Sequence, residues 1–106
     1  MNKIPTKEEI VSYLKRNKQF FKEKFGVIHI GIFGSIVRGD QNTQSDIDII
    51  IEMEKEKKNI HNFLNFKRFL EKQFGVEVDI GLESNIKPLV KEEIENEVIY
   101  VWEKKH

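Results

Sequence analysis

Cysteine is absent from this chain of 106 residues. Its absence excludes disulfide bonds, thiolate catalysis and zinc sites built on thiolates. Long apolar runs are missing too, and the apolar stretches that exist are far too short to span a bilayer as a helix. No repeat and no low-complexity linker divides the chain. The sequence therefore predicts a single domain over residues 1–106, with no room for a second, substrate-binding domain.

An excess of charge of either sign is also lacking. Lysine plus arginine and aspartate plus glutamate each number 18, so the formal net charge is zero. Broad, non-specific nucleic-acid binding depends on excess positive charge, and we expect no direct nucleic-acid partner. No signal peptide is visible, because residues 1–6 lead straight into a charged segment. We therefore expect a cytoplasmic protein without a membrane partner.

Capping signals and apolar periodicity predict an α+β fold. Thr6 and Glu9 match a capping box, and helices can end at Gly26 and Gly75 because glycine readily adopts the left-handed conformation. Ser84 or Asn85 can cap the last helix. The expected elements are a helix over 7–24, a strand over 27–33, a glycine turn with a helical turn over 34–39, a polar turn over 40–45, a strand over 46–53, a charged loop over 54–58, a helix over 59–74, a strand over 76–80, a helix over 87–96 and a β-prone tail over 98–102.

The most informative motif is Gly34-Ser35 followed ten residues later by Asp46-Ile47-Asp48. Successive side chains of a strand point to opposite faces, so Asp46 and Asp48 share one face, about 7 Å apart along the strand. Isoleucines at 47, 49 and 51 point the other way, into a core. Paired carboxylates suit hard cations such as Mg²⁺, which prefer oxygen ligands. The backbone N–H groups of a glycine turn can bind phosphate, so the motif predicts a nucleotide site.

Further side chains could join this site. Asp79 lies opposite the valines of its predicted strand and would face the same cleft if that strand pairs beside residues 46–53. Glu77 shares the face of Asp79 and is its main rival, and Glu83 is a weaker one. Arg38 follows Ser35 by about one helical turn, and arginine suits bidentate contact with phosphate; a surface salt bridge is the alternative. His29 fits a packed sheet histidine better than a metal ligand.

The pattern Gly34-Ser35-x-x-Arg38-Gly39 followed by Ser45-Asp46-x-Asp48 resembles the nucleotidyltransferase superfamily that includes DNA polymerase β. Within it, the short chain is similar to the minimal nucleotidyltransferase (MNT) proteins, the antitoxin partners of HEPN-domain toxins. The resemblance covers nearly the whole chain, and its specific part is residues 31–52. It implies the nucleotidyltransferase fold, a small mixed β-sheet with helices packed on one face.

The resemblance also implies an activity. AMP would pass from ATP to a tyrosine hydroxyl of a HEPN toxin ribonuclease, with two Mg²⁺ ions held by the carboxylates of Asp46, Asp48 and Asp79. Asp79 would also help to deprotonate the acceptor. Gly34, Ser35 and Arg38 would bind the triphosphate. The partners would be the toxin and ATP, in a hetero-oligomer.

Two other functions stay open on the sequence. The chain could neutralise its toxin by binding alone, although all three carboxylates and Gly34-Ser35 are present. It could also modify a small molecule, but enzymes of that kind usually carry a further helical domain. We rank the second alternative last because the chain has no room for such a domain.

Overall fold

The computed structural model describes residues 5–39 and 46–102, and the polar turn expected over 40–45 lies outside them. Its strands form one mixed sheet in the order β3-β2-β1-β4. Strand β1 (Val27–Phe33) is antiparallel to β2 (Ile47–Met53) and to β4 (Ile99–Trp102). Strand β3 (Val78–Leu82) is parallel to β2. The predicted α+β class with a small mixed sheet is confirmed.

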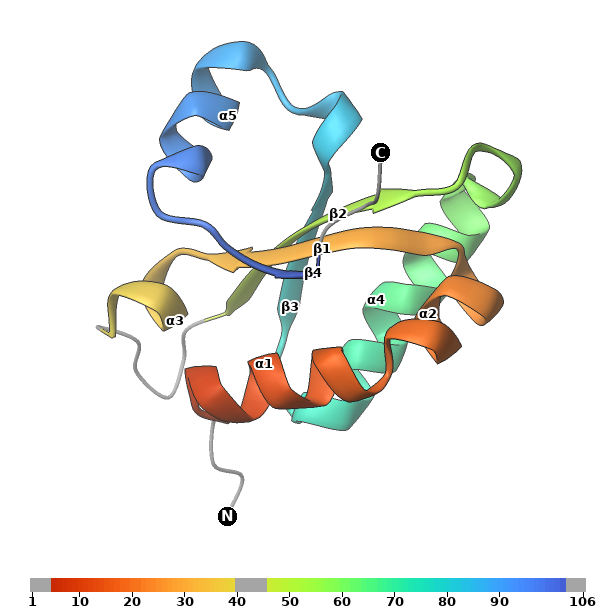
Figure 1. Ribbon diagram of the computed structural model, residues 1–106, viewed down its shortest axis with the longest axis horizontal. Helices are drawn as coiled ribbons and strands as arrows, with labels where there is room; N and C mark the ends of the chain where they lie inside the picture. Colours follow the sequence, from red (N-terminus) through yellow and green to blue (C-terminus); the bar gives the residue numbers. More distant parts are fainter. Residues whose placement is uncertain (1–4, 40–45, 103–106) are drawn as a thin grey trace.

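Helices cover one side of this sheet (Figure 1). They are α1 (Lys7–Arg16), α2 (Lys18–Phe25) and α4 (Ile60–Phe74). Helix α5 (Pro88–Glu95) lies on the other side, where the chain leaves β3 and returns into β4 (Figure 1). Three single-turn elements complete the described fold: α3 (Ser35–Arg38), η1 (Lys55–Lys57) and η2 (Glu83–Asn85).

The core lies between the sheet and the three covering helices. Ile47, Ile49 and Ile51 of β2 are buried, as the alternation in the sequence predicts. Opposite them, Phe21 of α2 and Phe66 of α4 meet edge to face with ring centroids 5.1 Å apart. Burial of such large apolar side chains stabilises the fold by roughly 1.5–3 kcal/mol each, and it fixes which face of β2 remains for polar residues.

The single helix expected over 7–24 is wrong, because the chain breaks between α1 and α2 at Asn17. The Asn17 side chain donates to the carbonyl of Tyr13 at 2.8 Å, a local bond that competes with the helical pattern. Trp102 Nε1 also donates to the carbonyl of Leu14 at 3.2 Å. That carbonyl would otherwise accept from Lys18 in a continuous helix.

Two other boundaries differ from the prediction. Strand β3 occupies 78–82 rather than 76–80, because its residues pair one for one with those of β2 starting from Ile47 and Val78. Neither Ser84 nor Asn85 caps α5, since both lie in η2 and the N-cap position belongs to Lys87, which makes no side-chain capping bond. The capping box of Thr6 and Glu9 is confirmed by hydrogen bonds of 2.8 and 3.1 Å.

Within residues 5–39 and 46–102, no helix has both the length and the apolar character needed to cross a membrane.

Candidate active site

The sheet register places two of the predicted carboxylates side by side. Asp48 of β2 and Asp79 of β3 are direct partners in the parallel pairing, and neighbouring strands lie about 4.8 Å apart. Both side chains point away from the isoleucine core, Asp48 being half-buried and Asp79 exposed. Asp46 lies just before β2 and is exposed. The condition placed on Asp79, that its strand should pair beside that of Asp48, is thereby met.

Electrostatic repulsion concentrates on Asp48. Burial, the charge of Asp79 and the charge of Asp46 raise the pKa of Asp48 from 3.8 to about 6, and Glu97 adds to the rise while Arg38 opposes it. A carboxylate whose negative neighbours outweigh its positive ones favours a bound proton or a cation. Asp46 and Asp79 therefore both act electrostatically on Asp48.

Gly34 forms the wall of the site opposite Asp48. It follows Phe33, which pairs with Asp48 across β1 and β2, and it has φ 79° and ψ −153°. This region of φ and ψ is essentially restricted to glycine. A Cβ on Gly34 would also collide with the Asp48 carboxylate. Ser35 then opens α3, so the predicted Gly34-Ser35 turn stands directly beside the carboxylates.

A residue that the sequence did not point to also contacts this turn. Glu97, in the turn between α5 and β4, accepts a hydrogen bond from Gly34 N at 2.9 Å. Its carboxylate also lies 3.2 Å and 3.4 Å from Arg38 Nη1. The contact joins positions 63 residues apart, and no motif around Glu97 announces it. The salt-bridge alternative for Arg38 is thus present, and its contact with phosphate stays a prediction.

Metal binding is supported by donor chemistry. Asp46, Asp48 and Asp79 offer only oxygen, the donor that Mg²⁺ prefers, and their mutual repulsion is what a cation would relieve. Among residues 5–39 and 46–102, no three His, Asp or Glu side chains are already gathered closely enough to hold a metal ion. Their role as ligands stays a prediction.

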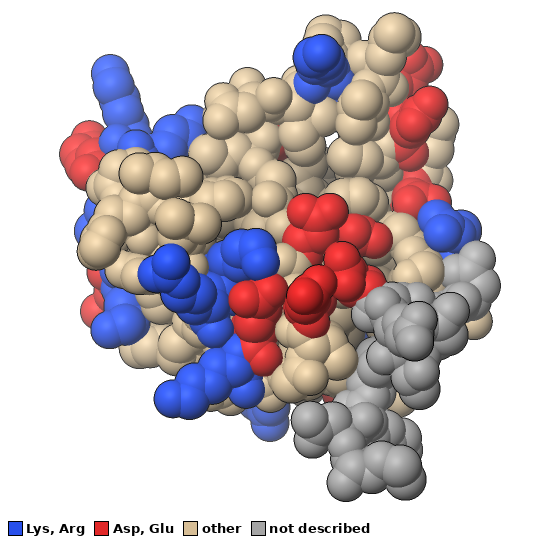
Figure 2. All heavy atoms as spheres, turned by 180° about the vertical axis from the view of Figure 1, so that it is seen from behind, with Lys and Arg blue, Asp and Glu red and all other residues tan. Residues whose placement is uncertain are grey.

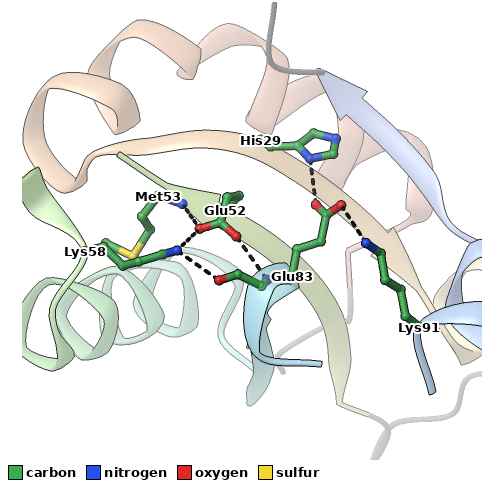
Figure 3. Close-up of polar contacts among 7 residues, drawn as sticks. His29, Glu52, Met53, Lys58, Glu83 and Lys91 are labelled. Carbon is green, nitrogen blue, oxygen red and sulfur yellow. Dashed lines mark hydrogen bonds and ion pairs between the residues drawn. The ribbon is translucent and has the colours of Figure 1, made fainter. Parts of the chain in front are cut away.

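The rival residues occupy other places. Glu77 is exposed and precedes β3, where its carbonyl accepts from Ile47 N at 3.1 Å. Glu83 lies 2.8 Å from His29 Nδ1, and the two point toward each other in Figure 3. His29 is buried, and its ring stacks on Tyr100 with centroids 4.5 Å apart. The prediction that His29 is a packed sheet residue is confirmed.

Figure 2 shows a central patch of acidic side chains on the side of the molecule opposite the view of Figure 1, with lysine and arginine side chains on one side of the patch and further acidic side chains near the edges.

Comparison with known proteins agrees with this geometry. The family model for the nucleotidyltransferase domain matches residues 14–101. Protein adenylyltransferase MntA of Thermococcus cleftensis is 38% identical over 96 residues, which are 91% of this chain and 96% of that protein.

Solved structures share the fold. One, named provisionally as a minimal nucleotidyltransferase, superposes with a TM-score of 0.72 at 26% identity, over 86% of this chain and 92% of that one. A chain from the complex of the tri-AMPylated Shewanella oneidensis HEPN toxin with an MNT antitoxin superposes with a TM-score of 0.61 at 12% identity. That match covers 89% of this chain and 73% of the other.

Proposed function

The chain belongs to the nucleotidyltransferase domain family and is a nucleotidyltransferase of the minimal, MntA-like kind, and we propose that it is an antitoxin which transfers AMP from ATP to a HEPN toxin. The observation on which the proposal rests is the pair Asp48 and Asp79, in register on adjacent strands, with Asp48 beside the Gly34 turn. The acceptor in this proposal is a tyrosine hydroxyl of the toxin, in the cytoplasm.

Each residue has a distinct part in the proposed reaction. The tyrosine oxygen attacks the α-phosphorus of ATP, a new O–P bond forms, and the bond from the α-phosphorus to the bridging oxygen breaks. Pyrophosphate leaves, and the tyrosine proton passes to the Asp79 carboxylate. Gly34 N–H, the Ser35 hydroxyl and Arg38 bind the triphosphate and hold the leaving group.

Asp46, Asp48 and Asp79 are the residues that would hold Mg²⁺. Two bound Mg²⁺ ions would supply neutralisation of phosphate charge and polarisation of the reacting oxygens. Asp48 contributes best when it is ionised, and its raised pKa places that ionisation close to neutral pH. Holding Asp48 between Asp79 and Gly34 fixes its orientation before substrate arrives, which lowers the entropy lost during the reaction.

The test is the intact mass of a candidate HEPN-type toxin, sought in the reading frame next to that of this chain, after incubation with the chain, ATP and Mg²⁺. We expect mass gains in steps of one AMP, which disappear when Asp46→Ala and Asp48→Ala are combined. Asp79→Ala should abolish the gain, whereas Glu77→Ala is the matched control and should retain it. If Glu77→Ala abolishes the mass gain and Asp79→Ala retains it, Glu77 rather than Asp79 is the third carboxylate of the site.

The same experiment separates modification from capture. If the toxin is silenced and co-purifies with the chain but gains no mass, transfer to the toxin is ruled out and neutralisation by binding takes its place. If the chain instead consumes ATP with a small hydroxylated acceptor and without the toxin, it is a small-molecule nucleotidyltransferase.

A further inference from the structure

The Glu97 side chain occupies hydrogen-bond donors that the proposed function assigns to the nucleotide. Gly34 N donates to Glu97 Oε1 at 2.9 Å, and Arg38 Nη1 lies 3.2 Å from Glu97 Oε2. The carboxylate thus contacts a backbone N–H and a guanidinium, the two kinds of group that bind phosphate oxygens. Gly34 has a single backbone N–H, so a triphosphate and Glu97 cannot both accept from it, and they compete for the charge of Arg38.

The backbone around Glu97 is held firmly in place. Its N–H and that of Val98 both donate to the carbonyl of Ile94, at 3.0 and 2.8 Å. Val98 and Tyr100 then close over the sheet at Gly31, where a Cβ would approach them to 2.8 and 2.9 Å. The side chain is freer, because 31% of it is exposed and so is 51% of Arg38. A rotamer change can therefore release the carboxylate without moving the strand.

The charge of Glu97 also reaches the carboxylate site. Glu97 accepts from Gly34 N, and a Cβ on Gly34 would meet the Asp48 carboxylate, so Glu97 places a further negative charge close to the carboxylates. An incoming triphosphate meets this charge as well as the occupied donors. Movement of the Glu97 side chain away from the turn would free the Gly34 N–H and would also reduce the repulsion that the triphosphate meets.

We propose that Glu97 is an internal competitor for the triphosphate subsite, which occupies Gly34 N–H and Arg38 in the nucleotide-free protein and is displaced when ATP binds. This inference rests on the proposed function, because it assumes that the Gly34 turn binds the triphosphate. It assigns Glu97 a part in setting nucleotide affinity. A partly exposed ion pair is weak, so displacement raises the apparent dissociation constant only modestly.

The test is the affinity of the full chain for AMP-PNP with Mg²⁺, measured by isothermal titration calorimetry. In Glu97→Gln the amide oxygen can still accept from Gly34 N–H, but the negative charge that pairs with Arg38 is gone. We expect binding to become roughly three- to tenfold tighter. The matched control is Glu95→Gln, an exposed residue at the end of α5, which should leave the affinity unchanged.

A second measurement does not depend on a variant. In the wild-type protein, the Gly34 amide resonance should move as AMP-PNP and Mg²⁺ are added, because the amide exchanges a carboxylate partner for a phosphate. In the ligand-free Glu97→Gln variant, the chemical shift of the Gly34 amide should already differ from its wild-type value, because its acceptor is no longer charged. If the Gly34 amide resonance keeps its position when the protein is saturated with AMP-PNP and Mg²⁺, Glu97 is not displaced by the nucleotide and the proposal is overturned.

The outcomes separate the two proposals. If wild type binds AMP-PNP but Glu97→Gln binds it equally or more weakly, competition is overturned while the nucleotide site stands. Weaker binding by the variant would mean that Glu97 supports binding by positioning Arg38, and equal binding would mean that Glu97 has no part in nucleotide affinity. If neither protein binds AMP-PNP, both the proposed nucleotide site and the competition at it are overturned.

Discussion

At the scale of single residues, Asp48 is the point of greatest electrostatic conflict. It is half-buried and pairs in register with Asp79, and burial together with its acidic neighbours raises its pKa to about 6. Folding proteins usually avoid such placements, since an ionised carboxylate loses hydration and gains repulsion. The same placement is useful for binding a cation, and this trade of stability for function is common at catalytic sites.

Replacing Asp48→Asn should stabilise the protein at neutral pH. A pKa of about 6 in place of 3.8 corresponds at full strength to about 3 kcal/mol, and solvent screening at this partly exposed side chain reduces it to about 1 kcal/mol. Folding raises the pKa of Asp48, so the free energy of unfolding of the wild-type protein is not reduced by Asp48 below about pH 4, where the side chain is protonated. That stability is lost as pH rises through about 6 and Asp48 ionises. Urea denaturation should show a gain of about 1 kcal/mol at pH 7.5 and almost none at pH 4.

The control for this change is Glu77→Gln, which removes one negative charge from an exposed position next to the same strand. A gain by Asp48→Asn that is equally large at pH 4 would show that the ionised charge of Asp48, with its burial and repulsion, is not the cause. A loss of stability at pH 7.5 would contradict the raised pKa itself.

The sequence predicted the positions of these carboxylates because their geometry is local. A period of two along a strand places Asp48 opposite the buried isoleucines and Asp79 opposite Val78 and Ile80. Glu97 could not be found in this way. Its contact with Gly34 spans 63 residues and depends on how α5 returns to the sheet, which no local pattern records.

At the scale of elements, the same contrast between local and distant contacts recurs. The strands over 27–33 and near 47–53 and the end of α4 at Gly75 follow from composition and capping, and they are observed. The break at Asn17 is different, since the carbonyl of Leu14 is taken by Trp102, 88 residues away. Tertiary contacts override helix propensity in such cases.

The path from β3 to α5 is fastened to the sheet by a buried polar cluster (Figure 3). Glu52 of β2 is 7% exposed, and it accepts from Ser84 N at 3.0 Å and pairs with Lys58 at 2.7 Å. Burial acts to raise the pKa of Glu52, but hydrogen bonds from Lys58, Met53 and Ser84 outweigh it and lower the pKa. Beside this cluster, Glu83 bonds to His29 and lies 3.9 Å from Lys91. These contacts hold η2, and through it the start of α5, against the sheet.

Glu52→Gln should therefore loosen η2. The neutral amide is a weaker acceptor and leaves the partly buried Lys58 ammonium without its counter-ion, at a cost of roughly 1–3 kcal/mol. We expect lower stability in urea at pH 7 and faster hydrogen exchange at Ser84 N. The lowered pKa means that the difference from wild type exists above about pH 4.5 and shrinks as pH falls below it.

Glu56→Gln provides the matched control, because Glu56 is an exposed carboxylate in η1, close to Lys58 in sequence. An effect of Glu56→Gln as large as that of Glu52→Gln would mean that general charge, rather than the buried cluster, stabilises this region. Unchanged hydrogen exchange at Ser84 N in Glu52→Gln would also show that the polar cluster does not hold η2 against the sheet.

At the scale of the whole molecule, the two sides of the sheet have different tasks. One side is packed under α1, α2 and α4 and supplies the apolar core, and the segment that contains α5 lies on the other side (Figure 1). Asp48 and Asp79 alternate with the buried Ile47, Ile49, Val78 and Ile80 and so point away from that core. Stability and site chemistry are thus separated by the alternation of residues along the same strands. Repulsion among the carboxylates lowers the stability of the ligand-free protein, and a ligand that relieves it should stabilise the whole fold.

ATP and Mg²⁺ together should therefore raise the melting temperature, because a ligand that binds only the folded state adds to its stability. At about a hundredfold excess over Kd the gain is about 2.7 kcal/mol, or roughly 10 °C for a chain of this size. Removing Mg²⁺ with EDTA should abolish most of this gain. Scanning calorimetry of the combined Asp46→Ala and Asp48→Ala variant is the decisive comparison. Its ligand-free melting temperature should match or exceed that of wild type, since repulsion is gone, while its response to Mg²⁺ should vanish. A full response in that variant would place the metal elsewhere.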